Sequence, residues 1–272
     1  MRKLMKVLLS VLVFALLGGS ASALTIPGAT EITIFDKNSS SGSWYDGTEA
    51  APGEDNEVEP GMLVGQAWDL EGFFREGTSL HMVGGFNFLT GQVGSGQTFT
   101  SGDLFIDVDG DAVYGDIHGG SNGITTVKNT FGYDYVMDLD WGASALGYTL
   151  YSIDENSDVK TSYYKQNKGS DPWQFAGGQT GVVETGSFGY QSNLDLGDTD
   201  VHNLVTFDIG FLWDLGLAGE TATFHFTMGC GNDNLMGQFL VPPTPPNDPV
   251  PEPGTMILLG FGLLGLAGMG RK

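Results

Sequence analysis

The chain has 272 residues, with 33 acidic and 11 basic side chains and a formal net charge of −22 at pH 7. This balance argues against nucleic acid as a partner, because phosphate binding requires a basic face. A single cysteine, Cys230, excludes an intramolecular disulfide framework, so the hydrophobic core must hold the fold without cross-links.

The first 23 residues have the parts of a secretory signal peptide. A basic start (residues 1–6) is followed by an apolar run, and Ala21 and Ala23 then frame a small-residue cleavage site. We therefore expect signal peptidase to cut before Leu24, where the mature chain begins. A transmembrane helix is the poorer interpretation, since the apolar run is short and a cleavage site follows it.

Short runs of alternating polar and apolar residues recur from residue 24 to residue 240, the period of a half-buried β-strand. Glycine- and aspartate-rich segments separate these runs, and the chain holds 43 glycines, which suit tight turns. The second and third runs form a predicted hairpin that turns at Glu76-Gly77. This spacing, without a helical period or a fixed repeat, predicts one all-β domain over 24–240, a β-sandwich or jelly roll. The expected strands are 31–35, 66–74, 79–88, 103–108, 133–141, 146–153, 181–188, 203–213 and 221–228.

One acidic turn has a composition suited to a metal ion. Asp107, Asp109 and Asp111 alternate with other residues, and Asp116 follows. Calcium takes six to eight oxygen ligands, and closely spaced carboxylates supply several of them. The spacing departs from the EF-hand loop, whose sixth position is glycine and here is Ala112. Two interpretations therefore stay open, a calcium site and a solvated acidic bend.

Indications of catalysis are weak. The four histidines are scattered singly, without zinc-ligand spacing. His225 and Cys230 are close in sequence, but a buried small residue at a strand end explains Cys230 equally well. Glycoside hydrolysis needs two carboxylates at a fixed separation, and Glu71 and Glu184 are available among many acids. Availability alone identifies no pair, so we expect a protein that is not an enzyme.

Aromatic residues in polar segments offer a different kind of site. Trp44, Tyr45 and Trp173 lie outside the expected strands. From an exposed loop such rings stack on sugars, whereas buried rings close the ends of a sandwich.

The C-terminal stretch has three parts in a fixed order. A proline-rich linker covers 241–253 and is expected to be extended and semi-rigid. Residues 254–272 then form a short apolar segment with a basic tail, near the lower limit for a membrane-spanning helix. The residues that define the motif are Val250, Pro251, Glu252, Pro253, Gly254, Arg271 and Lys272.

This order closely resembles the PEP-CTERM sorting signal of Gram-negative bacteria. The resemblance implies a secreted protein held briefly in the inner membrane, where an exosortase cleaves near the motif. The product then passes to the cell surface or the extracellular polysaccharide matrix. An uncut C-terminal anchor is the alternative, because the apolar segment alone does not distinguish the two.

Removal of both ends changes the charge of the expected product. Six basic side chains then remain against 33 acidic ones, a net charge of −27. We therefore expect an exported surface or matrix protein with a structural or adhesive role in exopolysaccharide or biofilm. A calcium-dependent carbohydrate-binding module is the alternative, and a glycoside hydrolase is a weaker one.

Overall fold

The computed structural model describes residues 24–34, 58, 62–113, 123–164 and 169–245. Within these ranges sixteen strands, one short α-helix and one 3-10 turn are formed, which confirms the all-β prediction. The predicted signal peptide, the sorting segment and most of the linker lie outside the described residues, so their bounds stay predictions.

The first sheet has five antiparallel strands in the order β1-β2-β3-β14-β13. The predicted hairpin is confirmed as β2 and β3, which pair from Leu70 opposite Gly84 to Glu76 opposite Ser79. Its turn contains Gly77 with a φ of 62°, a conformation that glycine adopts without strain. The strands are β1 (Thr30–Glu31), β2 (Leu70–Glu76), β3 (Ser79–Gly84), β13 (Gly189–Leu194) and β14 (His202–Asp208).

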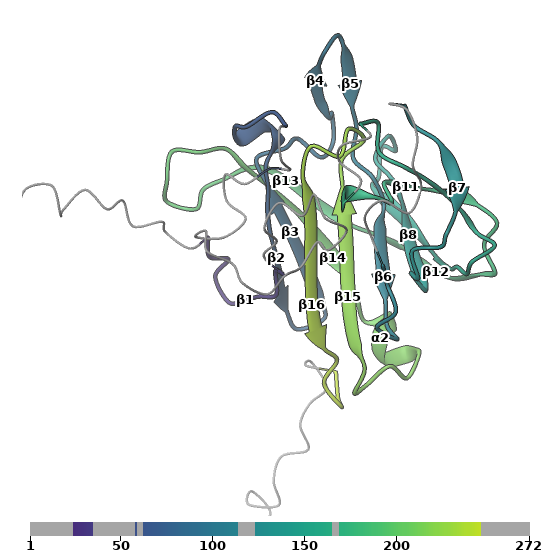
Figure 1. Ribbon diagram of the computed structural model, residues 1–272. Helices are drawn as coiled ribbons and strands as arrows, with labels where there is room; N and C mark the ends of the chain where they lie inside the picture. Colours follow the sequence, from purple (N-terminus) through teal and green to yellow (C-terminus); the bar gives the residue numbers. More distant parts are fainter. Residues whose placement is uncertain (1–23, 35–57, 59–61, 114–122, 165–168, 246–272) are drawn as a thin grey trace, which may run out of the picture.

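The second sheet has six antiparallel strands in the order β12-β9-β8-β6-β15-β16. It lies beside the first sheet in Figure 1, and the side chains between them form the main core, with Phe73, Leu80, Leu150 and Phe224 among its members. Alternation places Leu80 and Met82 of β3 and Ala222, Phe224 and Phe226 of β15 in this core. The strands are β6 (Leu104–Asp107), β8 (Tyr135–Asp140), β9 (Gly147–Ser152), β12 (Gly181–Ser187), β15 (Thr221–Thr227) and β16 (Asn234–Leu240).

A single residue carries the chain from one sheet to the other. β12 ends at Ser187, Phe188 points into the core, and β13 begins at Gly189. The edge strand of the second sheet thus continues directly into the edge strand of the first. Such sheet-switching strands close the corner of a sandwich.

A third, smaller sheet covers part of the outer face of the second. It consists of β7 (Thr126–Lys128), β10 (Asp158–Lys160) and β11 (Gln174–Gly177) in the order β11-β10-β7. A separate cluster that includes Phe105, Tyr133, Val136 and Val159 lies beneath it. The central strands are therefore buried on both faces, and β15 is buried from its second residue onward.

Asp103 ties the small sheet to the large one. Its carboxyl is wholly buried and accepts a hydrogen bond from Leu139 N–H in β8 (3.0 Å) and another from Phe175 N–H in β11 (2.8 Å). Burial raises the pKa of Asp103 to about 8, against the opposing effect of these two bonds. Gly102 beside it has no room for a side chain, since a Cβ would lie 2.2 Å from the Trp173 carbonyl oxygen.

The two ends of the sandwich carry the remaining elements. The hairpin of β4 (Gln92–Gly94) and β5 (Gln97–Phe99) projects from one end, and α2 (Phe211–Asp214) lies at the other (Figure 1). Near α2, Trp213 Nε1 donates to the Pro242 carbonyl (2.9 Å), which fixes the point where the chain leaves β16.

The expected strands differ from the observed ones in several places. Residues 66–68 form the 3-10 turn η2 (Gln66–Trp68), and the end of the expected strand 203–213 is α2. The hairpin β4–β5 lies in a segment expected to be a loop. Alternation also did not indicate the three strands of the small sheet, β13 or β16, because these strands are short, polar or interrupted by glycine.

We predict that Asp103→Ala lowers the free energy of unfolding by about 2–5 kcal/mol, because two buried N–H groups lose their acceptor. Asp103→Asn, which keeps one carbonyl oxygen, should lose less. Urea denaturation measures both changes, with the exposed Glu220→Ala as a control expected to stay within about 0.5 kcal/mol. An Asp103→Ala effect as small as that of the control would contradict this role.

Candidate functional site

The predicted metal turn begins where β6 ends. Asp107 is the last residue of that strand and is buried, whereas Asp109 in the turn is exposed. Asp107 Oδ1 accepts hydrogen bonds from the N–H groups of Asp109 (3.1 Å) and Gly110 (2.8 Å). Gly110 has a φ of 81°, which allows the chain to turn tightly around the carboxylate. The local sequence therefore holds this turn in one shape.

Asp134 joins the turn from the neighbouring strand. It directly precedes β8, which pairs antiparallel with β6, so the start of one strand lies beside the end of the other. Asp107, Asp109 and Asp134 each place one carboxylate oxygen within 4.8 Å of the other two. Sequence reasoning missed Asp134, although pairing of the expected strands 103–108 and 133–141 would have indicated it.

The three carboxylates repel one another in a partly dry environment. The pKa of Asp134 is raised to about 6, chiefly by burial and also by the charges of Asp109 and Asp107. A hydrogen bond from Val108 N–H to Asp134 Oδ2 (2.8 Å) has the opposite effect. The pKa of Asp107 is also raised, chiefly by burial. Such a site gains stability from a proton or from a cation.

The donor set fits calcium. The group offers carboxylate oxygens from two strand ends, and it contains no histidine or thiol that would favour zinc or copper. Calcium accepts carboxylates in one- or two-oxygen contact and completes its shell with backbone carbonyls and water. Asp107, Asp109 and Asp134 are therefore the residues that would hold the ion.

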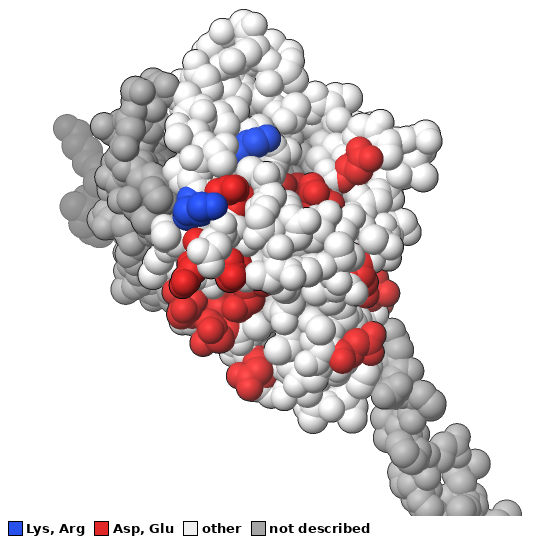
Figure 2. All heavy atoms as spheres, turned by 90° about the vertical axis from the view of Figure 1, so that its right-hand side faces the viewer, with Lys and Arg blue, Asp and Glu red and all other residues white. Residues whose placement is uncertain are grey.

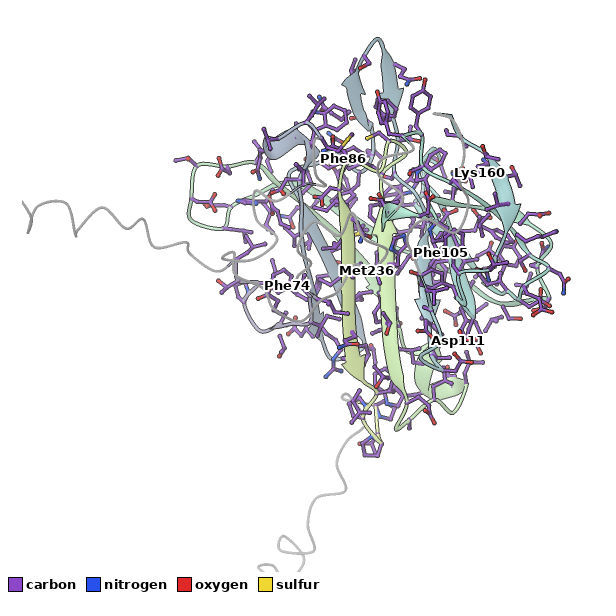
Figure 3. The ribbon with its side chains drawn as sticks, viewed as in Figure 1. Phe74, Phe86, Phe105, Asp111, Lys160 and Met236 are labelled. Carbon is purple, nitrogen blue, oxygen red and sulfur yellow. The ribbon has the colours of Figure 1, made fainter. Side chains whose placement is uncertain are left out.

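The two other predicted ligands stand apart from this group. Asp111 is exposed and is not one of the three carboxylates that converge, although its charge contributes to the raised pKa of Asp134. Its Oδ1 atom lies over Gly132, where a Cβ would come within 2.5 Å. Figure 3 shows Asp111 toward the end of the molecule that carries α2. Asp116 lies outside the described residues.

A polar hollow of about 510 Å³ lies on the second sheet. Leu139 and Leu150 point into the core, so their neighbours Asp138, Asp140 and Thr149 face outward. The register continues this row across the sheet, with Asp138 opposite Thr149 and Thr149 opposite Thr185. Gly147 and Gly186 line the hollow without side chains that would fill it. Its lining thus offers carboxylates and hydroxyls as hydrogen-bonding groups.

The surface around these features is acidic. Figure 2 shows acidic side chains gathered on the side of the molecule that lies at the right in Figure 1, with few basic side chains among them. Lys160 lies on the small sheet (Figure 3). Burial raises the pKa of Asp138, which lines the hollow, and the positive charge of Lys160 partly offsets this rise.

The other candidate residues from the sequence are buried in the interior or lie outside the described residues. His225 is wholly buried, its Nε2 lies 2.9 Å from the Pro172 carbonyl oxygen, and burial lowers its pKa to about 4. Cys230 is buried as well, which raises its pKa to about 12. Trp173 is 7% exposed, so of the two alternatives left open for this ring the buried one holds. Trp44 and Tyr45 lie outside the described residues.

The two glutamates considered for glycoside hydrolysis lie on different sheets. Glu71 is buried in β2, where its carboxylate faces His202 at 2.7 Å. Glu184 in β12 accepts a hydrogen bond from the Tyr148 hydroxyl (2.7 Å). Hydrolysis stays an untested alternative.

The pKa of Asp134 predicts how stability depends on pH in calcium-free buffer. The folded state holds its proton more tightly than the unfolded state, so this contribution is full below about 3.8 and is lost as pH rises through about 6. Asp134→Asn should therefore flatten the fall in unfolding free energy between pH 4 and 6, measured with a chelator present. Asp195→Asn, in another turn, is the control and should leave the pH profile of the unfolding free energy unchanged. If the unfolding free energy falls equally in Asp134→Asn and in wild type, the raised pKa of Asp134 is refuted.

Comparison with known proteins identifies the C-terminal segment. Among the residues that the structure describes, no helix has the length and apolar character needed to cross a membrane. No curated protein and no solved structure gives a match to the chain. Residues 249–272 match the family described as the PEP-CTERM protein-sorting motif, and this range includes all of the predicted motif residues. The chain therefore carries a PEP-CTERM sorting motif over residues 249–272, which supports export and exosortase-dependent sorting at the membrane toward the cell surface.

Proposed function

We propose that the mature protein is a non-enzymatic, calcium-stabilised β-sandwich with a structural or adhesive role in the exopolysaccharide or biofilm of a Gram-negative bacterium. The observation that supports it is the convergence of Asp107, Asp109 and Asp134 in an exported chain without disulfides. Signal peptidase and exosortase are the processing partners, and the inner membrane holds the chain only transiently.

Calcium suits both the site and the destination. Extracellular calcium modules bind with dissociation constants of about 10⁻⁴–10⁻³ M, a range set by few charged ligands and partial exposure. Asp109 is exposed and Asp107 is buried, so an ion would enter from solvent and bind against a fixed strand end. The bound ion would offset the repulsion among the carboxylates and join β6 to β8.

Carbohydrate binding is the second candidate function, and the hollow favours it. Sugars present hydroxyl groups that both donate and accept hydrogen bonds, and the lining of Asp138, Asp140, Thr149 and Thr185 matches that chemistry. A polysaccharide is then the partner, held on the outer face of the second sheet.

We predict that millimolar calcium raises the melting temperature in 0.15 M NaCl. With a Kd of about 10⁻⁴ M, calcium at ~10 mM stands at about a hundredfold Kd and adds ~2.7 kcal/mol, or roughly 5–11 °C for a domain of this size. The salt suppresses non-specific screening, whose range is about 8 Å under these conditions, whereas direct coordination persists. The test compares wild type with Asp109→Asn combined with Asp134→Asn.

Asp195→Asn is the matched control, because Asp195 also accepts a bond from the N–H two residues ahead but lies outside the cluster. It should respond to calcium as the wild type does. If calcium raises the melting temperature of the double variant as much as that of the wild type, the turn is only a solvated acidic bend and not a calcium site.

We also predict that the mature protein lacks both ends. Mass spectrometry of surface material from a host with exosortase should find a start at Leu24 and a C-terminus between Glu252 and Thr255. Recovery of intact residues 256–272 from the surface would instead indicate a permanent anchor.

A further inference from the structure

His202 is held between two carboxylates at the start of β14. Its Nδ1 lies 2.7 Å from Glu71 Oε2, and its Nε2 lies 2.9 Å from Asp198 Oδ1. The His202 and Glu71 side chains are 2% and 0% exposed, whereas Asp198 is 46% exposed. The imidazole thus connects a buried acid on β2 to an acid in the loop 195–201.

The geometry fixes the number of protons in this group. A neutral imidazole has one N–H and one lone pair, so with both carboxylates ionised one contact would set a lone pair against a negative oxygen. Both short distances are satisfied only if the group holds one more proton. That proton resides on the imidazole, as imidazolium, or on Glu71, which then donates to Nδ1. In both arrangements Nε2–H donates to Asp198.

The surroundings keep this proton in place. Burial lowers the pKa of His202, but the hydrogen bonds and charges of Asp198 and Glu71 outweigh it, and the net pKa is raised. Gln66 Nε2 donates to Glu71 Oε1 and to the Val201 carbonyl oxygen (2.9 Å). Glu71 and Asp198 are the charged groups that face the ring, from β2 and from the loop.

The loop 195–201 depends on this contact for its position. It projects from the sandwich between β13 and β14, and its residues are exposed except for the half-buried Leu196 (Figure 1). Asp195 and Asp198 make bonds within the loop to the N–H groups of Gly197 and Asp200, which shape it but do not attach it. Two contacts attach the loop to the rest of the protein. Asp198 contacts His202 at the start of β14, and the Val201 carbonyl oxygen accepts a hydrogen bond from Gln66 in η2.

We propose that Glu71, His202 and Asp198 form a proton-dependent lock that fastens the acidic loop 195–201 to the first sheet and releases it when the shared proton is lost. Asp198 is the moving part, since it is the exposed carboxylate and lies in the loop. Glu71 is the fixed part, buried in β2, where Gln66 of η2 donates to its Oε1 atom. The lock is independent of the calcium cluster, which lies on the other sheet.

The direction of the pH dependence follows from the raised pKa. The lock is complete below about pH 6.5, the ordinary pKa of histidine, and it is lost as pH rises through the higher folded-state value. Above that value Asp198 loses its contact with the ring and the loop gains mobility. A protein on the cell surface meets such changes in the external medium directly.

The test combines a site pKa with a measure of loop mobility on the chain from residue 24 to residue 245. Histidine NMR titration should place the pKa of His202 above 6.5, and His81, whose pKa burial lowers, serves as a control in the same spectra. Glu71→Gln and Asp198→Asn should each lower the His202 pKa. A fluorophore on Thr199→Cys then reports mobility, because the native Cys230 is buried.

Dye anisotropy should fall as pH rises through the His202 pKa in otherwise wild-type protein. In an Asp198→Ala background, which removes the acceptor of Nε2–H, the anisotropy should be low at every pH. Because Asp198 is exposed, this substitution leaves the buried Glu71–His202 pair in place. A His202 pKa at or below 6.5 would overturn the proposal. So would an anisotropy profile that Asp198→Ala does not change.

Discussion

Burial of the second sheet on both faces is the constraint on which the rest of the structure depends. The first sheet covers its inner face with a large apolar core, and the small sheet covers part of its outer face. Because β6, β8 and β15 are enclosed in this way, polar groups at their ends and outward positions must find partners within the protein. Asp103, His225 and Asp107 are all residues of this kind.

The chain provides partners for its buried carboxyl groups in three different ways. Asp103 receives backbone N–H groups from two sheets, so it joins layers that share no strand pairing. Asp107 accepts N–H groups of its own turn and leaves Asp109 and Asp134 close enough to attract a cation. Glu71 instead faces an imidazole and shares a proton with it. The same chemical group therefore serves as a structural tie and, as proposed above, as a calcium ligand and as part of the proton-dependent lock, according to what surrounds it.

The strands that alternation predicted are those with one face in the core. Residues 79–84 and 221–227 alternate clearly because they pack large apolar side chains against the opposite sheet. The strands of the small sheet have three or four residues with little apolar content, so tertiary pairing, and not pattern, makes them strands. Phe211–Asp214 continues the apolar run of β14, and only the fold shows that the run ends in a helical turn.

The residues of the candidate sites likewise divide into those that the local sequence predicts and those that depend on the fold. Asp107 and Asp109 were predictable, because they stand together in a turn after a strand. Asp134 depends on which strands are neighbours, and Glu71 with His202 depends on a contact across 131 residues. Local sequence carries no record of such pairings unless the strand order is known. For Trp173 the polar local sequence left both alternatives open, and only the fold shows that the ring is buried.

These features bear on how an acidic exported chain without disulfides stays folded. The repulsion among its carboxylates grows as they ionise, and no covalent cross-link limits the effect. Asp103, Asp134 and His202 all have raised pKa values, so the folded state takes up protons that the unfolded state lacks, and its stability falls as these groups lose them. A cation at Asp107, Asp109 and Asp134 replaces the proton at one of these places only. The fold therefore combines one position where, on the proposed function, calcium would substitute for a proton with two, Asp103 and His202, where the partners are protein groups and pH governs the interaction.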